Sequence, residues 1–361
     1  MIDAFRSGAT RVVVGRGILE AASRTIARDH RGSLIVIVSD ARVARLYGLS
    51  FARSLARRGA NTLLLKFPAG ERSKTRETKA RLEDRLAAAE VGRDTVVVAV
   101  GGGVTGDLAG FLAATWHRGV PVVQVPTTSL AMLDAALGGK TGVDLPSGKN
   151  LVGAFHPPLA LWADVAVLET LPARTYRAGL AEAVKAAAAL DVALFRYLEA
   201  NAARVLRREP GAIAHVVSRC LRTKAAIVAE DERDHGRRAI LNFGHTAAHA
   251  LEAASAYAIP HGEAVAIGLL AEARLAERKT GLPRAHADRI EALLGAFALP
   301  TRAPAGLSRR ALAAAMRRDK KSRAGVPRCA LPEALGRMPR GGDPTVAVDP
   351  LRELVPFLCR H

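Results

Sequence analysis

The pattern of apolar positions divides the chain into two parts. Short apolar runs rich in β-branched residues recur up to about residue 170, and Ala-, Leu- and Arg-rich segments of helical length, such as 41–58 and 74–90, lie between several of them. Continuous apolar runs of this length are typical of parallel strands buried on both faces. The first part therefore predicts an α/β layered domain. Its predicted strands are RVVVG (11–15), LIVIVS (34–39), NTLLLKF (61–67), TVVVAV (95–100) and PVVQVP (121–126).

From about residue 176 the strand pattern mostly disappears. Segments such as AGLAEAVKAAAALDVALFRYLEANAARVL and GEAVAIGLLAEARLAERKTG have the period and the residue preferences of helices. A proline and a glycine flank a polar stretch at 168–179, where we place the boundary between the two parts. We therefore predict an α/β domain over 1–175 and an all-α domain over 176–361.

Composition argues against several classes of protein. No apolar run reaches the ~18 residues of a membrane span, and the N-terminus lacks the apolar core of a secretion signal. Three cysteines without CxxC spacing agree with a reducing compartment, so we expect a cytoplasmic protein without a membrane partner. The net charge of +19 could indicate a protein that binds nucleic acid. The basic residues are spread along helical segments with few aromatics, however, so we expect no nucleic-acid partner. The electrostatic field of this positive charge would still favour the binding of a small, multiply anionic substrate.

A glycine-rich stretch follows the strand TVVVAV. Gly101, Gly103 and Gly106 fit the pattern G-x-G-x-x-G between a strand and a helix, where backbone N–H groups bind the pyrophosphate of a dinucleotide. A tight turn without a ligand is the alternative. An ordinary dinucleotide-binding domain has an acidic ribose ligand ~20 residues later at a strand end, and none is present here. We therefore predict a rearranged domain, with Asp40 at the end of an earlier strand as the ribose ligand.

Two further segments carry polar residues that suit a bound anion. Glu71 and Lys74 follow the strand at 61–67, where they could reach an adenosine or, as sequence alone favours, lie in solvent at a helix N-terminus. The segment 126–153 shows little regular periodicity but is too apolar in part for disorder, and long irregular segments are often functional. We predict an irregular binding loop, with lysines suited to phosphate or hydroxyl groups. Its polar residues are Thr127, Thr128, Asp134, Lys140, Lys149 and Asn150.

Three of the ten histidines lie close together in the second part. His245 and His249 have i, i+4 spacing, which puts them on one face of a helix, and His261 begins another helical segment. Glu182 could add a carboxylate, which would complete the His/His/Glu pattern of a catalytic zinc site with an open position. Spacing alone nominates His245 and His249 as the metal pair. The alternative is that one or two of these histidines are hydrogen-bonded interior groups.

Together these stretches closely resemble the 3-dehydroquinate synthase family of sugar-phosphate cyclases. The matching motifs include GGGVTGDLAGFLAATWHRG, QVPTTSLAMLDAALGGKTGVDLPSGKNLVGAFHPP, GLAEAVK, GRRAILNFGHTAAHALE, HGEAVAIG and RDKK, in the expected order over about 34–335. The resemblance implies a Rossmann-like but rearranged NAD-binding domain, a helical metal- and substrate-binding domain, and an active site in the cleft between them. It also implies a homodimer and the cofactors NAD and zinc or cobalt.

The family's reaction accounts for this mixture of motifs. The resemblance implies that NAD+ takes hydride from C5 of 3-deoxy-D-arabino-heptulosonate 7-phosphate, which makes the neighbouring proton acidic. Phosphate then leaves by β-elimination, the hydride returns, the ring opens, and an intramolecular aldol step gives 3-dehydroquinate. The metal would polarise the C5 oxygen. The expected partner is thus a small anionic sugar phosphate of the shikimate pathway.

Residue roles follow from the matching motif positions. The resemblance assigns the metal to Glu182, His245 and His261, and makes His249 a ligand of the substrate phosphate. The cofactor shell would be Asp40, Glu71, Lys74, Gly101, Gly102, Gly103, Asp107, Thr127, Thr128, Lys149 and Thr170. The catalytic and substrate-binding residues would be Asp134 and Lys140 at the reacting hydroxyls, Asn150, Lys185, Asn242, His249 and Lys320 at the phosphate, Arg118 from a neighbouring subunit, and Lys224 and Arg238 at the carboxylate.

Departures from the family pattern are few. Asp144 stands where the common pattern has Asn, and Ala247 and Ala248 replace a bulkier pair; neither change is expected to touch the predicted ligand set. The alternatives are a sister cyclase acting on another sugar phosphate or an aminated substrate, and a metal-dependent polyol dehydrogenase. The chain keeps the residues assigned above to the phosphate and the carboxylate, which favours the carboxylated substrate.

Overall fold

The computed structural model describes residues 2–318, 325–340 and 343–359. The chain forms two compact units, Met1–Leu171 and Pro172–His361, which we call unit 1 and unit 2. The division lies just before the boundary at 175/176 that the sequence suggests, because helix α6 (Ala173–Leu190) begins directly after Pro172. A proline fits this place because the start of a helix needs no hydrogen bond from its N–H group.

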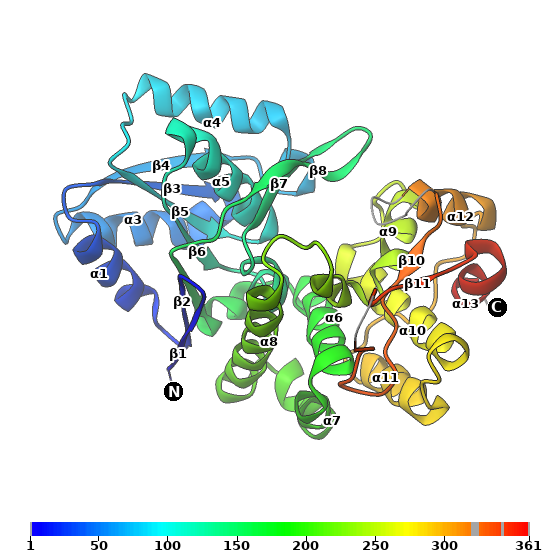
Figure 1. Ribbon diagram of the computed structural model, residues 1–361. Helices are drawn as coiled ribbons and strands as arrows, with labels where there is room; N and C mark the ends of the chain where they lie inside the picture. Colours follow the sequence, from blue (N-terminus) through cyan, green and yellow to red (C-terminus); the bar gives the residue numbers. More distant parts are fainter. Residues whose placement is uncertain (1, 319–324, 341–342, 360–361) are drawn as a thin grey trace. The chain divides into compact units, whose positions relative to one another are not determined.

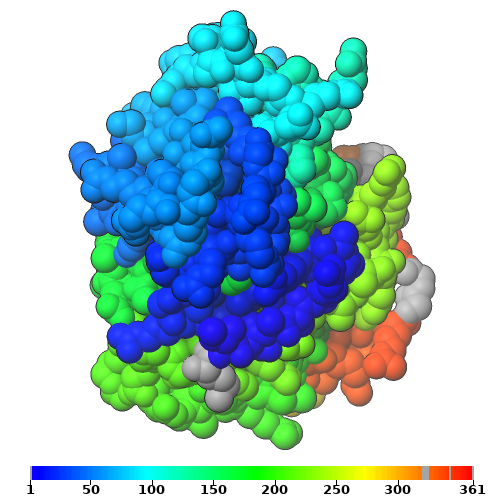
Figure 2. Space-filling view, turned by 90° about the vertical axis from the view of Figure 1, so that its left-hand side faces the viewer, coloured from blue at the N-terminus to red at the C-terminus, as the bar shows by residue number. Residues whose placement is uncertain are grey.

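Unit 1 is built on a sheet with the strand order β1-β2-β9-β6-β5-β3-β4. β1 pairs antiparallel with β2, and the other neighbours pair parallel. The sequence predicts all of these strands except β1 and β9. β1 has no continuous apolar run, because it is an edge strand with alternating half-buried and exposed residues. The strands are β1 (Asp3–Ser7), β2 (Thr10–Gly15), β3 (Leu34–Asp40), β4 (Asn61–Phe67), β5 (Thr95–Gly101), β6 (Val122–Pro126) and β9 (Ala160–Asp164). In the space-filling view the beginning of the chain, in blue, lies at the surface of unit 1 (Figure 2).

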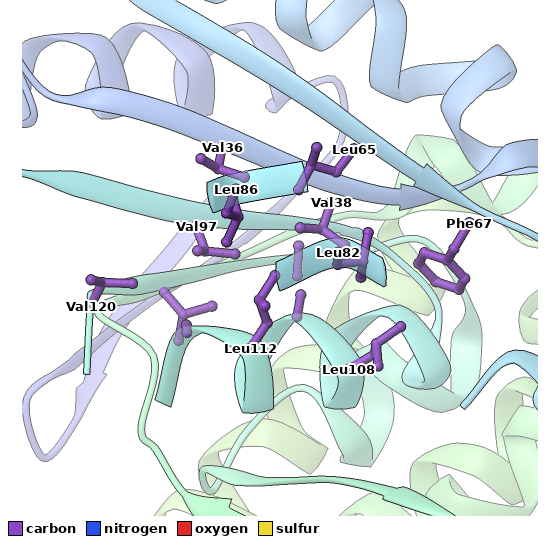
Figure 3. Close-up of a cluster of buried hydrophobic side chains, with 14 of the residues drawn as sticks. Val36, Val38, Leu65, Phe67, Leu82, Leu86, Val97, Leu108, Leu112 and Val120 are labelled. Carbon is purple, nitrogen blue, oxygen red and sulfur yellow. The ribbon is translucent and has the colours of Figure 1, made fainter. Parts of the chain in front are cut away.

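Helices cover both faces of this sheet (Figure 1). On one face, α1 and α3 bury residues such as Ile26 and Leu55 against the strands. On the other, Leu82 and Leu86 of α4 and Leu108 of α5 pack against apolar side chains of β3, β4 and β5 (Figure 3). β5 is buried along its whole length, which explains its continuous apolar sequence. The helices are α1 (Leu19–Asp29), α2 (Ala41–Val43), α3 (Leu49–Ala56), α4 (Arg76–Ala88) and α5 (Gly103–Thr115).

The segment 126–153 is more regular than its sequence suggests. It contains a π-helix, η4 (Ala131–Ala135), and most of an antiparallel hairpin of β7 (Lys140–Leu145) and β8 (Gly148–Phe155). The expectation of an irregular loop is therefore wrong. Glycines conceal the strand pattern, because β7 and β8 come so close that a Cβ at Gly153 would lie 1.9 Å from Thr141 O.

The described residues of unit 2 are mostly helical and include a short two-stranded sheet of β10 (Arg328–Cys329) and β11 (Val346–Ala347). Its helix α10 packs on both α9 and α6, so segments far apart in the sequence come together. Within the described part of the chain, no helix combines the length and hydrophobicity of a membrane span. The helices after α6 are α7 (Val192–Leu206), α8 (Pro210–Glu230), α9 (His245–Ala254), α10 (His261–Lys279), α11 (Arg284–Ala296), α12 (Arg309–Arg318) and α13 (Val355–Leu358).

Candidate functional site

The glycine-rich stretch lies where the strand order of the unit 1 sheet reverses. From β3 the chain moves outward to β4, and from β5 it moves the other way to β6, while β3 and β5 are neighbours. In open α/β sheets, ligands bind at the carboxyl ends of the strands at such a reversal. Asp40 ends β3 and Gly101 ends β5, so two of the predicted cofactor residues lie at this point.

The start of α5 has the features of a phosphate site. Gly102 is its N-cap and Gly103 its first residue, so this is where the N–H groups of the first turn and the positive end of the helix dipole lie. The hydroxyls of Thr127, which follows β6, and of Thr105 in α5 are buried and have no hydrogen-bond partner among the described residues. A buried hydroxyl without a partner is costly, and a polar ligand would remove that cost. The residues present therefore fit a bound dinucleotide.

Other predicted cofactor residues of unit 1 are partly engaged by the protein itself. Asp40 Oδ1 accepts hydrogen bonds from two N–H groups of the next turn and so caps α2. Glu71 lies 3.2 Å from the ammonium of Lys149. Thr170, at the end of the 3-10 helix η5 (Val165–Thr170), shares a 2.6 Å hydrogen bond with a tyrosine hydroxyl. A cofactor would have to share these groups with their protein partners.

Lys74 links the start of α5 to the β7–β8 hairpin. Its ammonium lies 2.5 Å from Asp107 and donates a hydrogen bond to Asn150 Oδ1, and only 4% of the residue is exposed. Burial lowers the pKa of this lysine, but the nearby charges, Asp107 first and then Glu71, outweigh burial and hold the pKa above its ordinary value. The charged Lys74 therefore contacts both Asp107, a predicted cofactor residue, and Asn150, a predicted substrate residue.

The departure from the family pattern at Asp144 reaches this cluster, and the expectation that it touches none of the predicted ligands is wrong. Asp144 Oδ1 accepts a 2.8 Å hydrogen bond from the N–H of Asn150, and the N–H of Asp144 donates to Lys74 O. Burial raises the pKa of the Asp144 carboxyl, and the Lys74 charge opposes that effect. Asn150 itself has φ +55°, which few side chains adopt, so the carboxylate helps to hold the hairpin in this conformation.

The remaining predicted residues of unit 1 lie on separate elements. Asp134 belongs to η4, whose start is held by a hydrogen bond to the Thr128 hydroxyl, and Lys140 begins β7 with an exposed side chain. Arg118 ends the 3-10 helix η3 (Trp116–Arg118), where it is exposed and has φ +67°. Their contacts with a substrate stay predictions.

A compact group of ligand atoms forms where α6, α9 and α10 meet. Glu182 on α6, His245 on α9 and His261 on α10 offer ligand atoms within 4.8 Å of one another. His245 Nε2 lies 3.6 Å and His261 Nε2 lies 3.4 Å from the same oxygen, Glu182 Oε1. Two imidazole nitrogens and a carboxylate oxygen that converge on one place are a donor set suited to zinc. We call these three residues the ligand triad.

The second nitrogen of each imidazole has its own acceptor. His245 Nδ1 lies 3.2 Å from Phe243 O, and His261 Nδ1 lies 3.2 Å from Glu252 Oε2. Since both acceptors require a proton on Nδ1, Nε2 is the nitrogen of each ring that is left to bind a metal. The triad therefore fits a divalent metal in its ring tautomers as well as in its distances.

The charged groups at the triad lie close to one another, and they change the pKa of His261. The Lys185 ammonium lies 2.6 Å from Glu182 Oε2, and both residues are buried. Burial lowers the pKa of His261, but hydrogen bonds to Glu182 and Glu252 outweigh burial and raise this pKa to about 9. Without a metal, His261 is therefore protonated on both ring nitrogens at neutral pH. A metal ion that binds Nε2 would have to displace the proton on that atom.

Direct backbone contacts between helices set the spacing of the triad. A Cβ at Gly262, the residue after His261, would lie 1.9 Å from Ala178 O on α6. A Cβ at Gly268, further along α10, would lie 2.1 Å from the carbonyl oxygen of Gly244, the N-cap of α9. Only glycine permits helices to approach this closely, so α10 holds both α6 and α9 at the distance the ligands require.

A buried acid fixes the start of α9, where His245 lies. Glu272 on α10 accepts hydrogen bonds of 2.7 Å from the N–H of Gly244 and of 3.0 Å from the N–H of Ala247. These N–H groups belong to the first turn, which has no helical acceptors, and a carboxylate also suits the positive end of the helix dipole. Glu272 therefore positions a metal ligand without touching the metal site.

The residues assigned to the substrate in unit 2 lie beside the triad or on neighbouring elements. The His249 ring centroid is 5.6 Å from that of His245, so His249 borders the triad although it is not one of the converging ligands. Arg238 and Asn242 lie on the 3-10 helix η6 (Arg237–Asn242), where Arg238 is buried and donates to Glu232 O. Lys224 lies on α8, and Lys320 lies outside the described residues.

Comparison with known proteins agrees with this geometry. Residues 64–178 match the family model of the 3-dehydroquinate synthase N-terminal domain, and residues 179–322 match that of the C-terminal domain. The chain belongs to the 3-dehydroquinate synthase family. The 3-dehydroquinate synthase of Symbiobacterium thermophilum is 45% identical to it over 334 residues, which are 91% of this chain and 92% of that protein.

Solved structures of related cyclases confirm the predicted fold class. A 2-deoxy-scyllo-inosose synthase complexed with carbaglucose-6-phosphate, NAD+ and Co²⁺ has a TM-score of 0.89 at 28% identity, and the match covers 98% of this chain and 99% of that one. The 2-epi-5-epi-valiolone synthase of Streptomyces hygroscopicus subsp. jinggangensis, with NAD+ and Zn²⁺ bound, has a TM-score of 0.85 at 31% identity over 99% and 98% of the two chains.

Two buried acids near the ligand triad were not predicted from the sequence, Glu252 and Glu272. A signal for Glu252 was present, because it follows His249 by three residues on α9 and so lies on the same helical face. No local signal could have found Glu272, since the N–H group of Gly244 that it caps lies 28 residues away in the sequence.

Proposed function

We propose that the chain converts 3-deoxy-D-arabino-heptulosonate 7-phosphate to 3-dehydroquinate and phosphate, using NAD+ and a divalent metal. The observation that carries this proposal is the ligand triad beside the buried Lys185, in a chain of the 3-dehydroquinate synthase family. Relatives with that name match over most of the chain, and the two sister cyclases bind NAD+ with cobalt or zinc. The reaction is that of a carbon–oxygen lyase of the shikimate pathway.

The cofactors supply the chemistry that side chains lack: NAD+ is a reversible hydride acceptor, and a metal at the triad polarises the reacting oxygen. The start of α5 and its glycines would hold the pyrophosphate on backbone N–H groups, and Asp40 would bind the ribose. The rest of the proposed cofactor shell is Glu71, Lys74, Asp107, Thr127, Thr128, Lys149 and Thr170.

The substrate would be held by charge at both of its ends. Arg238 and Lys224 would bind the carboxylate, for which a guanidinium offers two parallel N–H donors. The phosphate would be bound by Lys185, Asn150, Asn242, His249 and Lys320, and the reacting hydroxyls by Asp134 and Lys140. Both zinc and cobalt suit the triad. The cytoplasmic location stays a prediction from the cysteine content.

The decisive experiment follows both products in one reaction. The metal-loaded protein is incubated with catalytic NAD+ and the heptulosonate phosphate, and phosphate and 3-dehydroquinate are measured together. We expect equal amounts of both, loss of both after chelation, and recovery after Zn²⁺ or Co²⁺ is restored. If a folded, metal-bearing protein released no phosphate, that result would contradict the proposal. Turnover of an aminated or other sugar phosphate would indicate a sister cyclase. Net formation of NADH from a polyol would indicate a dehydrogenase.

We further propose a homodimer in which Arg118 of one subunit binds the phosphate in the other. Arg118→Ala is expected to lower kcat/KM about 100-fold, because a charged phosphate contact is lost. Mixed dimers of Arg118→Ala and His261→Ala chains should then regain activity, since each mixed dimer has one site with neither change. A statistical mixture is expected to reach about a quarter of the wild-type rate. If Arg118 acted within its own subunit, every site would keep one defect and the mixture would stay inactive.

A further inference from the structure

Glu252 is a buried acid that the proposed reaction does not use. It lies on the last turn of α9 and only 2% of it is exposed, although burying a carboxylate is unfavourable unless hydrogen bonds or cations compensate. Its Oε2 lies 3.2 Å from Nδ1 of His261, the first residue of α10. The carboxylate therefore reaches across the turn between two helices to a ligand of the proposed metal.

The geometry places Glu252 on the outer side of the His261 ring. The Nδ1 atom faces Glu252, while Nε2 faces Glu182 Oε1 at 3.4 Å. Glu252 is not one of the converging ligands, which are Glu182, His245 and His261 among the described residues. Glu252 is therefore placed to act on the metal through the imidazole and not by direct coordination.

The two histidine ligands differ in the acceptor behind them. His245 donates from Nδ1 to a neutral backbone carbonyl, Phe243 O, whereas His261 donates to a carboxylate. Either acceptor sets the tautomer, but a carboxylate also makes the opposite nitrogen a stronger electron donor. The His261 side chain is 32% exposed and the His245 side chain is 10% exposed, so the surrounding protein restrains the His261 ring less. His261 therefore needs a strong acceptor on Nδ1 more than His245 does.

We propose that Glu252 is a positioning residue of the metal site, which accepts the Nδ1 proton of His261 and holds the ring with Nε2 directed at Glu182 Oε1. The ligand is a divalent cation of the zinc or cobalt class. This inference rests on the proposed function only in taking the triad as a metal site, and it does not depend on the identity of the substrate.

The test measures metal binding without substrate. Zn²⁺ affinity is measured by competition with a chromophoric chelator for the wild-type chain, Glu252→Gln and Glu252→Leu. We expect Glu252→Gln, which keeps a neutral acceptor, to bind Zn²⁺ roughly 10-fold more weakly, and Glu252→Leu roughly 100-fold more weakly. The visible absorption of the Co²⁺-loaded variants is expected to shift, because the ring of one ligand is no longer held.

Glu263→Gln is the matched control. Glu263 lies two residues after His261 on the same helix, and its carboxylate pairs with the exposed Arg174 instead of a ligand. This change removes the same charge from the same region, so the expected change in Zn²⁺ affinity is less than about 3-fold. A loss equal to that of Glu252→Gln would show a general effect of charge and would overturn the proposal.

Unchanged Zn²⁺ affinity in folded Glu252→Gln would also overturn the proposal, whatever Glu252→Leu does. The failure of this inference is distinct from a failure of the proposed function. A wild-type chain that turns over the heptulosonate phosphate while Glu252→Gln binds Zn²⁺ normally refutes only the role of Glu252. A chain whose Zn²⁺ affinity depends on Glu252 but that releases no phosphate refutes only the proposed substrate.

Discussion

Replacing His261 with alanine is expected to abolish both metal binding and turnover. His261 Nε2 is one of two imidazole nitrogens that approach Glu182 Oε1, so the variant keeps only two of the three converging ligands. Metal polarisation of the reacting oxygen contributes several kcal/mol to transition-state stabilisation, and kcat/KM is therefore expected to fall by ~10³-fold or more. The bound metal is measured by elemental analysis after dialysis, and the rate by phosphate release.

His249→Ala is the control that separates the two readings of the histidine cluster. His249 has the i, i+4 spacing from His245 that a metal pair on one helix would have, but it lies outside the ligand triad. The variant is therefore expected to keep its metal and to lose activity through weaker binding of the substrate, with a raised KM. Loss of metal from His249→Ala, with retention in His261→Ala, would show that the assignment of the ligands is wrong.

Replacing Gly262 with alanine is expected to damage the metal site without changing a ligand. The new Cβ would lie 1.9 Å from Ala178 O, a rigid backbone atom, so α10 has to move away from α6. Overpacking of this kind costs about 3 kcal/mol of the free energy of unfolding. The same movement separates His261 from Glu182, so we expect weaker Zn²⁺ binding in the fraction that stays folded. Urea unfolding and chelator competition measure the two effects.

Gly295→Ala is the matched control for this change. Gly295 lies in α11, has no positive φ, and a Cβ there would meet no atom within 4 Å. Alanine is the better helix former, so this variant is expected to be equally stable or more stable by about 0.5–1 kcal/mol, with unchanged metal affinity. Equal behaviour of the two variants would contradict the view that backbone contact at Gly262 sets the distance between the ligands.

Much of the nucleotide-binding half could be predicted because its signals are local. β3 and β5 are continuous apolar runs that end in Asp40 and Gly101, and the glycines that follow β5 mark a strand–turn–helix unit. The hairpin of β7 and β8 could not be predicted in this way. Its close approach at Gly142 and Gly153 requires glycine at positions where strands ordinarily carry β-branched residues.

Spacing was least informative at the metal site. The i, i+4 rule pairs His245 with His249 because it considers one helix, whereas the ligands of the triad come from α6, α9 and α10. The match of the motif order to a known family supplied the set that spacing alone could not. Of the two buried acids near the ligands, Glu252 had a local signal in the sequence, whereas the contact of Glu272 with Gly244 was found only in the structure.

The α/β and helical halves, the glycine-rich start of α5 and the residue types available for a metal could all be recognised in the sequence, because period, propensity and turn chemistry act over a few residues. No local pattern shows which of these side chains converge, because their convergence depends on contacts between distant helices. Glu182 and His261 come within 3.4 Å because the backbones of α6 and α10 touch at Gly262. A contact between helices so far apart in the chain has no counterpart in any local pattern.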